Sequence, residues 1–486
     1  MKRVAASLVA CLVLAACGGS SFEQPEPVAP DRAGLSEETL ARQLAEAIAY
    51  PTIAKAGEPG HNAEVFAQFQ AFLAREYPRV FEQLDVTDLG HGTLWFTLQG
   101  SDASLDPAVL IAHQDVVPVE PGTEGGWSYP AFDGVIAGGY VWGRGAIDMK
   151  GHLVTLMAAM ESLLEDGFAP VRTIHIGLGA DEEVAGIGAG LMASWLEERG
   201  RRAWFVLDEG GSLVLDMPLT GRPTALIAVA EKGYLTVEVT ARARGGHSSS
   251  PPQRTAVGLL ARAITAIEDH PFEMSLEGGP VDEMLLALAP DMEGLQGFAA
   301  SSPGLFGGLI VNAMKDEDAP RAMLGTTIAP TVIEGGIVEN VLPQHATALI
   351  NLRLHPRTSI EDALAHLREA VAGLDGVTIE PHAPGSEAPP VAAMEGRAWE
   401  IVAGAAAAFA PEGTPVAPSL LVAGTDSRFF AGVADNIYRY SPARIEMEDL
   451  SRIHGTDERM KTSNLPVMAD YFRTVMVEAG TSGADR

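Results

Sequence analysis

The chain has 486 residues and a formal net charge of −31, with 47% hydrophobic and 20% charged residues. At roughly 100–200 residues per domain, this length accommodates two or three domains with real hydrophobic cores. The acidity argues against nucleic acid or an anionic membrane face as a partner, because both attract basic surfaces. We interpret the charge as a solubility feature rather than as a guide to the substrate.

Residues 1–17, MKRVAASLVACLVLAAC, have the features of a secretory leader, with basic Lys2 and Arg3 before an apolar run. The run is too short for a transmembrane helix. Its ending resembles the bacterial lipoprotein signal, in which Cys17 is lipidated; ordinary cleavage nearby is the alternative. Residues 18–35, rich in Gly, Ser, Pro and Glu, are predicted to be a flexible tether. We therefore expect an exported bacterial lipoprotein facing the periplasm, with the outer membrane as its expected location and the lipid anchor as its membrane contact.

Helical periodicity alternates with apolar strand-like runs in the first half of the chain. The predicted helices cover 36–50, 61–77, 151–167 and 188–200. The predicted strands lie within 93–100, 108–115, 173–183 and 203–211. Apolar strands that alternate with helices predict an α/β domain with a mainly parallel sheet and helices on both faces.

After about residue 230 the strands alternate between apolar and polar residues, as half-exposed strands do. They lie within 233–246, 326–336, 346–356 and 376–382, with helices over 256–270 and 359–373. This pattern predicts an inserted α+β lid, a two-layer sandwich over 231–385. Because residues 383–391 form a Pro-rich linker, the catalytic domain is predicted to comprise 36–230 and 386–482. Residues 280–325 have no predicted placement.

Titratable side chains follow several of the predicted strands. They are His113, Asp115, Asp148, the run Asp181-Glu182-Glu183, and Asp208. In open α/β sheets ligands bind at the carboxyl ends of the strands, and grouped carboxylates repel one another unless a cation lies between them. Histidine and carboxylate ligands without cysteine suit zinc, with Mn²⁺ or Co²⁺ as substitutes. Two such ions need a bridging carboxylate, and the tandem Glu182-Glu183 offers one base and one ligand.

Four segments together resemble the dizinc aminoacylase and carboxypeptidase family, peptidase family M20. They are 113–152, ADEEVAG at 180–186, GGHSS at 245–249 and HGTDER at 454–459. The 34 residues between His113 and Asp148 are most similar to the carboxypeptidase S and N-fatty-acyl-amino-acid hydrolase branch. The resemblance extends over about residues 36–480, and as a set these motifs are highly specific.

The resemblance implies two zinc ions that share one carboxylate. His113, Asp148 and Asp208 would hold the first ion. Asp148, Glu183 and His454 would hold the second. Asp148 would thus bridge the pair.

The resemblance also implies three catalytic residues. Glu182 would be the general base that takes a proton from the bridging water and passes it to the leaving amine. Asp115 would bond to His113 and fix its tautomer. His247 of the lid would stabilise the oxyanion, from its own subunit or from a partner subunit. The family has a cis peptide after the bridging aspartate, here Asp148-Met149.

Four further residues match substrate-binding positions of the family. Asn340 and Arg353 belong to the lid, and the arginine fork suits a substrate carboxylate. Gly424 and Thr425 belong to a glycine-containing loop, AGTDSR at 423–428, expected near the substrate backbone. Thr425 acting only as a helix cap is the alternative for that residue.

The leading hypothesis is a zinc-dependent hydrolase of amide bonds next to a free carboxylate, acting through metal-bound hydroxide. Its substrate would be a small peptide, as for a carboxypeptidase or dipeptidase, or an N-acyl amino acid. Two alternatives stay open: a fatty N-acyl amino acid hydrolase/synthase, and a non-catalytic solute-binding lipoprotein. A homodimer through the lid and a monomer whose own lid supplies His247 also both stay open.

Overall fold

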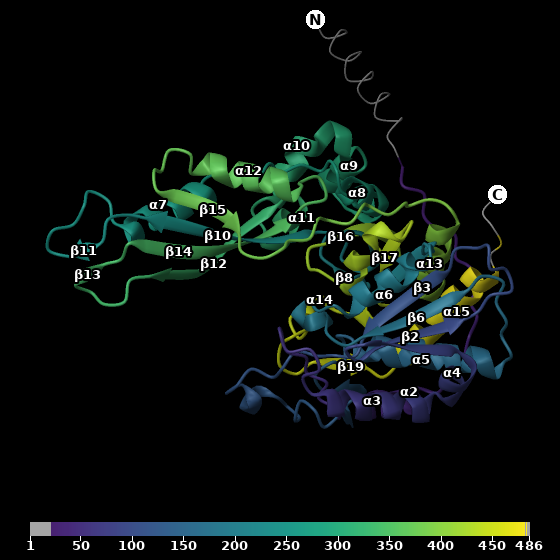
Figure 1. Ribbon diagram of the computed structural model, residues 1–486. Helices are drawn as coiled ribbons and strands as arrows, with labels where there is room; N and C mark the ends of the chain where they lie inside the picture. Colours follow the sequence, from purple (N-terminus) through teal and green to yellow (C-terminus); the bar gives the residue numbers. More distant parts are fainter. Residues whose placement is uncertain (1–20, 482, 484–486) are drawn as a thin grey trace, which may run out of the picture.

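The computed structural model describes residues 21–481 and 483. Its larger domain is built on a ten-stranded mixed sheet (Figure 1). The strand order is β1-β2-β6-β3-β7-β17-β9-β8-β18, and β16 pairs with β9. Neighbours β3, β6 and β7 run parallel, as do β17 and β7. The strands are β1 Asp85–Gly90, β2 Thr93–Leu98, β3 Ala108–His113, β6 Ile174–Gly179, β7 Phe205–Asp208, β8 Leu213–Met217, β9 Arg222–Glu231, β16 Val416–Leu421, β17 Ile437–Arg439 and β18 Arg444–Ile445.

Strand β3 shows why the central strands are apolar throughout. All its residues are buried. Alternate side chains point to opposite faces of the sheet, so Leu110 and Ala112 enter one core while Val109 and Ile111 enter another. Since helices cover both faces, neither face tolerates polar residues, and the continuous apolar run follows.

Helices cover the two faces of this sheet. The core that includes Leu110 is formed with α2 Glu37–Ile48, α3 Ala63–Glu76, α5 Lys150–Glu165, α13 Arg397–Phe409 and α15 Asn464–Thr481. The opposite face is covered by α6 Gly188–Glu197. A small sheet of β4 Val135–Ala137, β5 Tyr140–Trp142 and β19 Arg459–Lys461 completes the domain, together with α4 Pro78–Gln83 and α14 Met447–Leu450.

The lid is a separate four-stranded antiparallel sheet that extends away from the larger domain (Figure 1). Its order is β12 Thr327–Gly335, β14 His345–Leu354, β10 Gly233–Arg242 and β15 Val377–Pro381. Helices α7 Ala256–Glu268 and α12 Ile360–Ala370 pack on one face and close a second core. The short strands β11 Gly246–His247 and β13 Val341–Leu342 pair at the far tip. The predicted fold class, a mainly parallel domain with an α+β lid, is confirmed.

The segment that the sequence did not place forms four helices. They are α8 Val281–Leu288, α9 Gly294–Ala300, α10 Pro303–Met314 and α11 Asp318–Met323. Buried Val281, Leu285 and Leu288 of α8 belong to the core of the larger domain. This part of 231–385 therefore packs with the larger domain rather than with the lid sheet.

The first described residues, 21–35, have no helix or strand, in keeping with their Pro and Gly content. They nevertheless lie along the larger domain. The Ala33 amide donates to Asp470 Oδ1 of α15 (2.8 Å), and the Val28 amide donates to Gly404 O of α13 (3.2 Å). This part of the predicted tether is thus attached to the domain surface.

The predicted leader 1–17, including Cys17, lies outside the described residues. Within the described part of the chain, we find no helix that combines the length and the apolarity needed to cross a bilayer.

His175 of β6 is a buried histidine in the core of the larger domain. It stacks on Trp95 with ring centroids 4.8 Å apart, and its Nδ1 lies 3.0 Å from Thr97 Oγ1. Burial lowers the pKa of His175 from 6.5 to about 3. The unfolded chain therefore binds a proton at this position between pH 3 and 6.5 that the folded chain does not bind.

We predict that His175→Phe, which keeps an aromatic ring against Trp95, makes unfolding less dependent on pH. From pH 8 to 5 the wild type should lose about 2 kcal/mol of unfolding free energy through His175, and the variant should lack that loss. Urea titrations of both proteins at the two pH values measure it. An equal loss in both proteins would contradict the prediction.

Candidate metal centre

The candidate centre lies at the carboxyl ends of three neighbouring parallel strands. His113 is the last residue of β3, and Asp208 is the last residue of β7. Glu182 and Glu183 follow β6 in a short 3-10 turn, Glu182–Val184. Because these strands are parallel neighbours, their carboxyl ends bring the predicted residues to one edge of the sheet.

The carboxylate of Asp148 lies between two imidazoles. Its Oδ1 is 3.1 Å from His113 Nε2, and its Oδ2 is 3.1 Å from His454 Nε2. Glu183 Oε2 is 3.0 Å from the same nitrogen of His454. The structure thus brings these four predicted ligands together with Asp148 in the bridging place. The peptide bond Asp148-Met149 is cis, as the resemblance implied.

These residues fit a bound cation. Ligand atoms of His113, Asp148 and Glu183 all lie within 4.8 Å of one another. Glu183 Oε1 is buried and has no hydrogen-bond partner among the described residues. A buried carboxylate oxygen without a partner is costly, and a divalent metal would satisfy it. The histidine and carboxylate donor set suits zinc.

Asp115 orients two parts of the centre. Its backbone carbonyl oxygen lies 3.0 Å from His113 Nδ1, and its carboxylate oxygen Oδ1 lies 3.5 Å from the same atom. A proton on Nδ1 leaves Nε2 free to bind metal. The carboxylate also accepts the amides of Glu182 (3.2 Å) and Glu183 (3.0 Å). Asp115 therefore positions the predicted base as well as the first histidine.

The structure points Glu209, rather than Asp208, toward His113. Glu209 Oε1 lies 3.1 Å from His113 Nε2. The carboxylate of Asp208 instead accepts the amides of Glu209 (2.8 Å) and Ser427 (2.9 Å). Sequence reasoning missed Glu209, although a second acid directly after a strand end was the available signal.

A buried ion pair connects the two loops that carry Asp148 and His454. The Glu458 carboxylate accepts Arg144 Nη1 (2.7 Å) and the amides of Ile147 (2.8 Å) and Asp148 (3.1 Å). Arg144 Nη2 donates to the carbonyl of His454 (3.0 Å). Sequence reasoning missed both residues of the pair, although each lies inside a motif that it had singled out.

Burial of several acids makes the centre electrostatically unfavourable without a cation. Burial raises the pKa of Glu182 well above its ordinary value, and it raises the pKa values of Glu209 and Asp426 to about 8. Hydrogen bonds to Asp148 and Glu183 raise the pKa of His454 to about 10. Since protons occupy these groups when no metal does, metal binding releases protons and weakens at low pH.

Two arginines converge on the 423–428 loop beside Glu182. A Cβ placed on Gly424 would lie 3.3 Å from Arg428 Nη1 and 3.8 Å from Arg353 Nη1. Arg428 Nη1 is also 4.0 Å from Glu182 Oε1. Arg353 comes from β14 of the lid, so this is the place where the lid approaches the centre. Sequence reasoning found Arg353 and Gly424 but missed Arg428.

The hydroxyl of Thr425 is engaged within the protein. It donates to Glu231 Oε2 (3.0 Å) and lies 2.7 Å from Ser427 Oγ, while the Thr425 amide donates to Glu231 Oε1 (3.0 Å). Glu231 is also paired with fully buried Arg439 at 2.6 Å. Thr425 makes no side-chain cap hydrogen bond to the 3-10 helix that follows it. Its visible role is to hold the loop against the end of β9.

His247 and Asn340 lie together at the lid tip. The Ser248 amide donates to Asn340 O (3.1 Å), and His247 Nδ1 accepts the Ser249 amide (3.1 Å). Their strands, β11 and β13, stand at the end of the lid that points away from the larger domain (Figure 1). The structure therefore does not bring these two residues to the metal centre of their own chain.

The chain is similar to known proteins over most of its length. The model of peptidase family M20/M25/M40 matches residues 109–478. The N-fatty-acyl-amino acid synthase/hydrolase PM20D1 of Homo sapiens is 33% identical, over 90% of this chain and 87% of its own length. Carboxypeptidase S of Saccharomyces cerevisiae is 29% identical, over 86% of this chain and 80% of its own.

Solved structures show the same fold at lower sequence identity. The M20 family metallo-carboxypeptidase Sso-CP2 from Sulfolobus solfataricus superposes with a TM-score of 0.66 at 19% identity, covering 92% of this chain and 100% of that one. Human carnosine dipeptidase 1 gives a TM-score of 0.62 at 15% identity, covering 91% and 96%.

We predict that Glu209→Gln weakens zinc binding by roughly tenfold or more, because a ligand atom next to His113 loses its charge. Asp208→Asn should weaken it less, since the amide oxygen can still accept one backbone amide. Competition titrations against a chelator measure both affinities, with Glu183→Gln as the reference for a lost ligand. A large loss for Asp208→Asn with none for Glu209→Gln would support the sequence-based assignment instead.

Proposed function

Because this chain belongs to peptidase family M20/M25/M40, a family of metal-dependent hydrolases, we propose that it is a two-zinc enzyme that cleaves amide bonds beside a free carboxylate. The substrate class is a small peptide or an N-acyl amino acid. The observation that carries the proposal is the position of Arg353 and Arg428 at the loop next to Glu182, beside the histidine and carboxylate cluster.

In this proposal the first zinc is held by His113, Asp148 and Glu209, and the second by Asp148, Glu183 and His454. Glu209 replaces Asp208 because its carboxylate is the one beside His113. When bound, the metal pair supplies Lewis-acid polarisation of the scissile carbonyl and activation of water.

Glu182 is the proposed general base. Its backbone is held by Asp115, and its carboxylate lies 4.0 Å from Arg428. Burial raises the pKa of Glu182, which suits a group that accepts a proton and then passes it to the leaving amine. Arg428 lies close enough to orient this carboxylate, and its Nη1 also donates to the carbonyl of Thr425 in the same loop (2.8 Å).

Arg353 and Arg428 are proposed to bind the substrate carboxylate from two sides. Planar guanidinium groups bind carboxylates with paired hydrogen bonds. Arg353 belongs to the lid and Arg428 to the larger domain, so a bound carboxylate would connect them. Gly424 leaves the space between them open, because a side chain there would contact both arginines.

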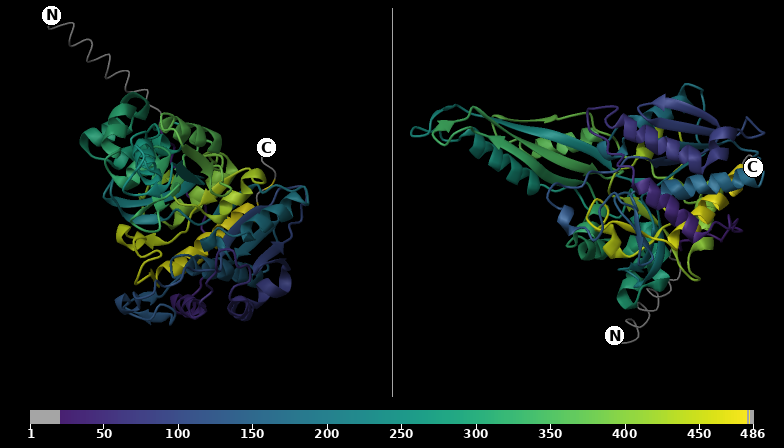
Figure 2. Two further views of the ribbon diagram at one scale, coloured as in Figure 1. Left: turned by 60° about the vertical axis from the view of Figure 1, so that its left-hand side comes forward. Right: turned by 90° about the horizontal axis from the view of Figure 1, so that it is seen from below.

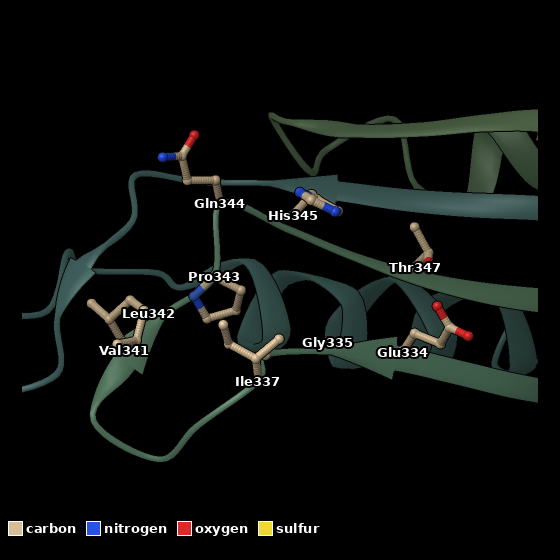
Figure 3. Close-up of a pocket in the computed structure, with 10 residues that line it drawn as sticks. Glu334, Gly335, Ile337, Val341, Leu342, Pro343, Gln344, His345 and Thr347 are labelled. Carbon is tan, nitrogen blue, oxygen red and sulfur yellow. The ribbon is translucent and has the colours of Figure 1, made fainter.

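We further propose that a second copy of the chain supplies His247. The lid sheet has an unpaired edge at β12, and apolar side chains of β12 and the tip are exposed: Val332, Ile333, Ile337, Val338 and Val341. Exposed apolar edge strands are sites of association. Ile337, Val341 and Pro343 line a cavity of about 490 Å³ near this tip. Figure 3 shows their side chains. A dimer through the lid would account for a histidine that its own centre does not reach.

The leader supports a further proposal on location. The run before Cys17 and its LAAC ending support an exported lipoprotein held on the periplasmic side, with the outer membrane as the proposed site.

Fatty N-acyl amino acids are a second candidate substrate class, since PM20D1 is named a synthase/hydrolase of such compounds. A series of N-acyl amino acids with increasing chain length distinguishes the two classes.

We expect the purified chain to hold about two zinc ions and to hydrolyse members of a panel of dipeptides and N-acyl amino acids. Chelation should abolish turnover, and zinc should restore it. Glu182→Gln should retain the metal but lose at least about a hundredfold in kcat, since a general base contributes that much. Elemental analysis and product chromatography provide the two measurements.

The outcomes of this experiment separate the parts of the proposal. Two zinc ions without turnover on any member of the panel would contradict the substrate class. The absence of metal from the wild type would contradict the ligand set and favour a binding lipoprotein.

We predict that inactive His247→Ala and inactive Glu182→Gln chains regain activity when mixed under conditions that exchange subunits. One site in each mixed dimer would then combine an intact Glu182 with His247 of the partner subunit. Turnover by the mixture should reach up to roughly a quarter of the wild-type value, the fraction of restored sites expected from random pairing. No recovery, with mixed dimers demonstrated by differently tagged chains, would contradict a role for His247 across the interface.

A further inference from the structure

Helices α9 and α10 form an uncharged hairpin on the surface of an acidic protein. Residues 294–314 contain no Asp, Glu, Lys or Arg, whereas the whole chain is 20% charged. Four large apolar side chains of this hairpin are exposed: Leu295 (85%), Phe298 (51%), Leu305 (66%) and Leu309 (69%). Patches of this kind on soluble domains mark interaction sites.

The fold does not account for these four side chains, because the hairpin already has another face that packs on the protein. Ile310, Val311 and Met314 of α10 lie against the core of the larger domain. Leu305 and Leu309 are four residues apart and share the other face of α10. Phe298 of α9 contacts Phe306 of α10 with ring centroids 5.3 Å apart, so the two helices present one joined surface.

The start of the described chain lies beside this hairpin. Gln24 Nε2 donates to Ala287 O of α8 (3.4 Å). A cavity of about 380 Å³ is lined on one side by Gln24, Pro25 and Pro27 and on the other by residues 287–291, just before α9. In Figure 1 the purple beginning of the chain runs past α8. The right-hand view of Figure 2 shows the lid extending away from the larger domain.

This proximity identifies the surface that the hairpin would meet. Five residue-to-residue steps lead from Cys17 to Phe22, which packs on Trp399 of the larger domain. At no more than about 3.6 Å per residue, they span at most about 18 Å. A lipid on Cys17 would therefore hold this side of the domain against the bilayer.

We propose that the α9–α10 hairpin is a bilayer-docking surface whose four exposed apolar side chains insert at the membrane interface. Transfer of apolar area out of water supplies the attraction. Charge cannot supply it, because a chain with a net charge of −31 is repelled by anionic headgroups. The lack of charged residues in 294–314 keeps that repulsion away from the contact. The hairpin would thus add a second membrane contact to the lipid anchor, independently of the catalytic proposal.

A fluorophore at the hairpin tests the proposal. The chain from residue 18 onward, which lacks the apolar leader and contains no cysteine, carries Ser302→Cys in the turn between α9 and α10, labelled with an environment-sensitive dye. Vesicles of phosphatidylethanolamine with a minority of phosphatidylglycerol are then added. We expect a blue shift of the emission and quenching by lipids labelled in the acyl chain. The same dye on Ala372→Cys, in the turn after α12 of the lid, should show neither change.

Each other outcome overturns the proposal. A chain that does not float with the vesicles, or that floats without a shift at position 302, does not insert the hairpin. A blue shift at position 302 before vesicles are added means that another part of the chain or a second copy already covers the patch. Dilution separates these two cases, because only the second depends on concentration.

A variant with all four exposed side chains replaced by Gln gives an independent test. Leu295→Gln, Phe298→Gln, Leu305→Gln and Leu309→Gln together should weaken vesicle binding by roughly tenfold or more. The matched control replaces exposed apolar residues of other elements, Val86→Gln, Ile136→Gln and Val171→Gln, and should bind as the wild type does. Both variants should keep the wild-type melting temperature and the turnover of a water-soluble substrate. Equal vesicle binding by the two variants would overturn the proposal.

Discussion

The carboxylate of Asp148, shared between the imidazoles of His113 and His454, is the contact on which the centre depends. The two histidines come from opposite ends of the sequence of the larger domain, and only the assembled sheet brings them to one carboxylate. The parallel register of β3 and β6 sets the height of His113 relative to the Glu182-Glu183 turn. The buried Glu458–Arg144 pair positions Asp148 and His454 relative to each other. Glu458 accepts the amide of Asp148, and Arg144 donates to the carbonyl of His454. A shift in either element would move a ligand away from the bridging position.

The cost of this arrangement lies in the raised pKa values of its buried acids. Burial raises the pKa of Glu182 and brings the pKa of Glu209 to about 8, so the site disfavours its own negative charge. A divalent cation reverses that preference, since it favours the ionised form of every carboxylate around it. The protein thereby stores an unfavourable electrostatic arrangement that metal binding relieves. Hydrogen bonds from two backbone amides to Asp208 reduce the cost at one acid and leave the neighbouring Glu209 to face the histidine.

Local patterns in the sequence predict the fold class and place several acids and His113 near strand ends, whereas the ligand set itself was implied by the resemblance of four motifs to peptidase family M20. A strand such as β3, with apolar residues throughout, implies cover on both faces, and a histidine at its end implies a site. Whether Asp208 or Glu209 faces His113 depends on the direction of the backbone where β7 ends. The alternation of side chains between the two faces of a strand no longer applies beyond that point. Arg428 and the Glu458–Arg144 pair act through contacts distant in sequence, so spacing alone could not assign their roles. The helices of 281–323 escaped prediction because their glycines and methionines blur the helical period.

Two surfaces of this acidic chain are apolar, and we propose a different role for each. The exposed β12 edge and lid tip are apolar where a second copy would bring His247 toward a centre that its own chain does not reach. The α9–α10 hairpin is apolar beside the N-terminal segment, where a lipid-anchored chain would meet a membrane. The net charge of the whole chain is −31, and charged surface favours solubility. These two apolar areas run against that tendency. The separation is consistent with one apolar surface serving assembly and the other serving attachment, and it allows a dimer to form through the lids while each hairpin stays available to the bilayer.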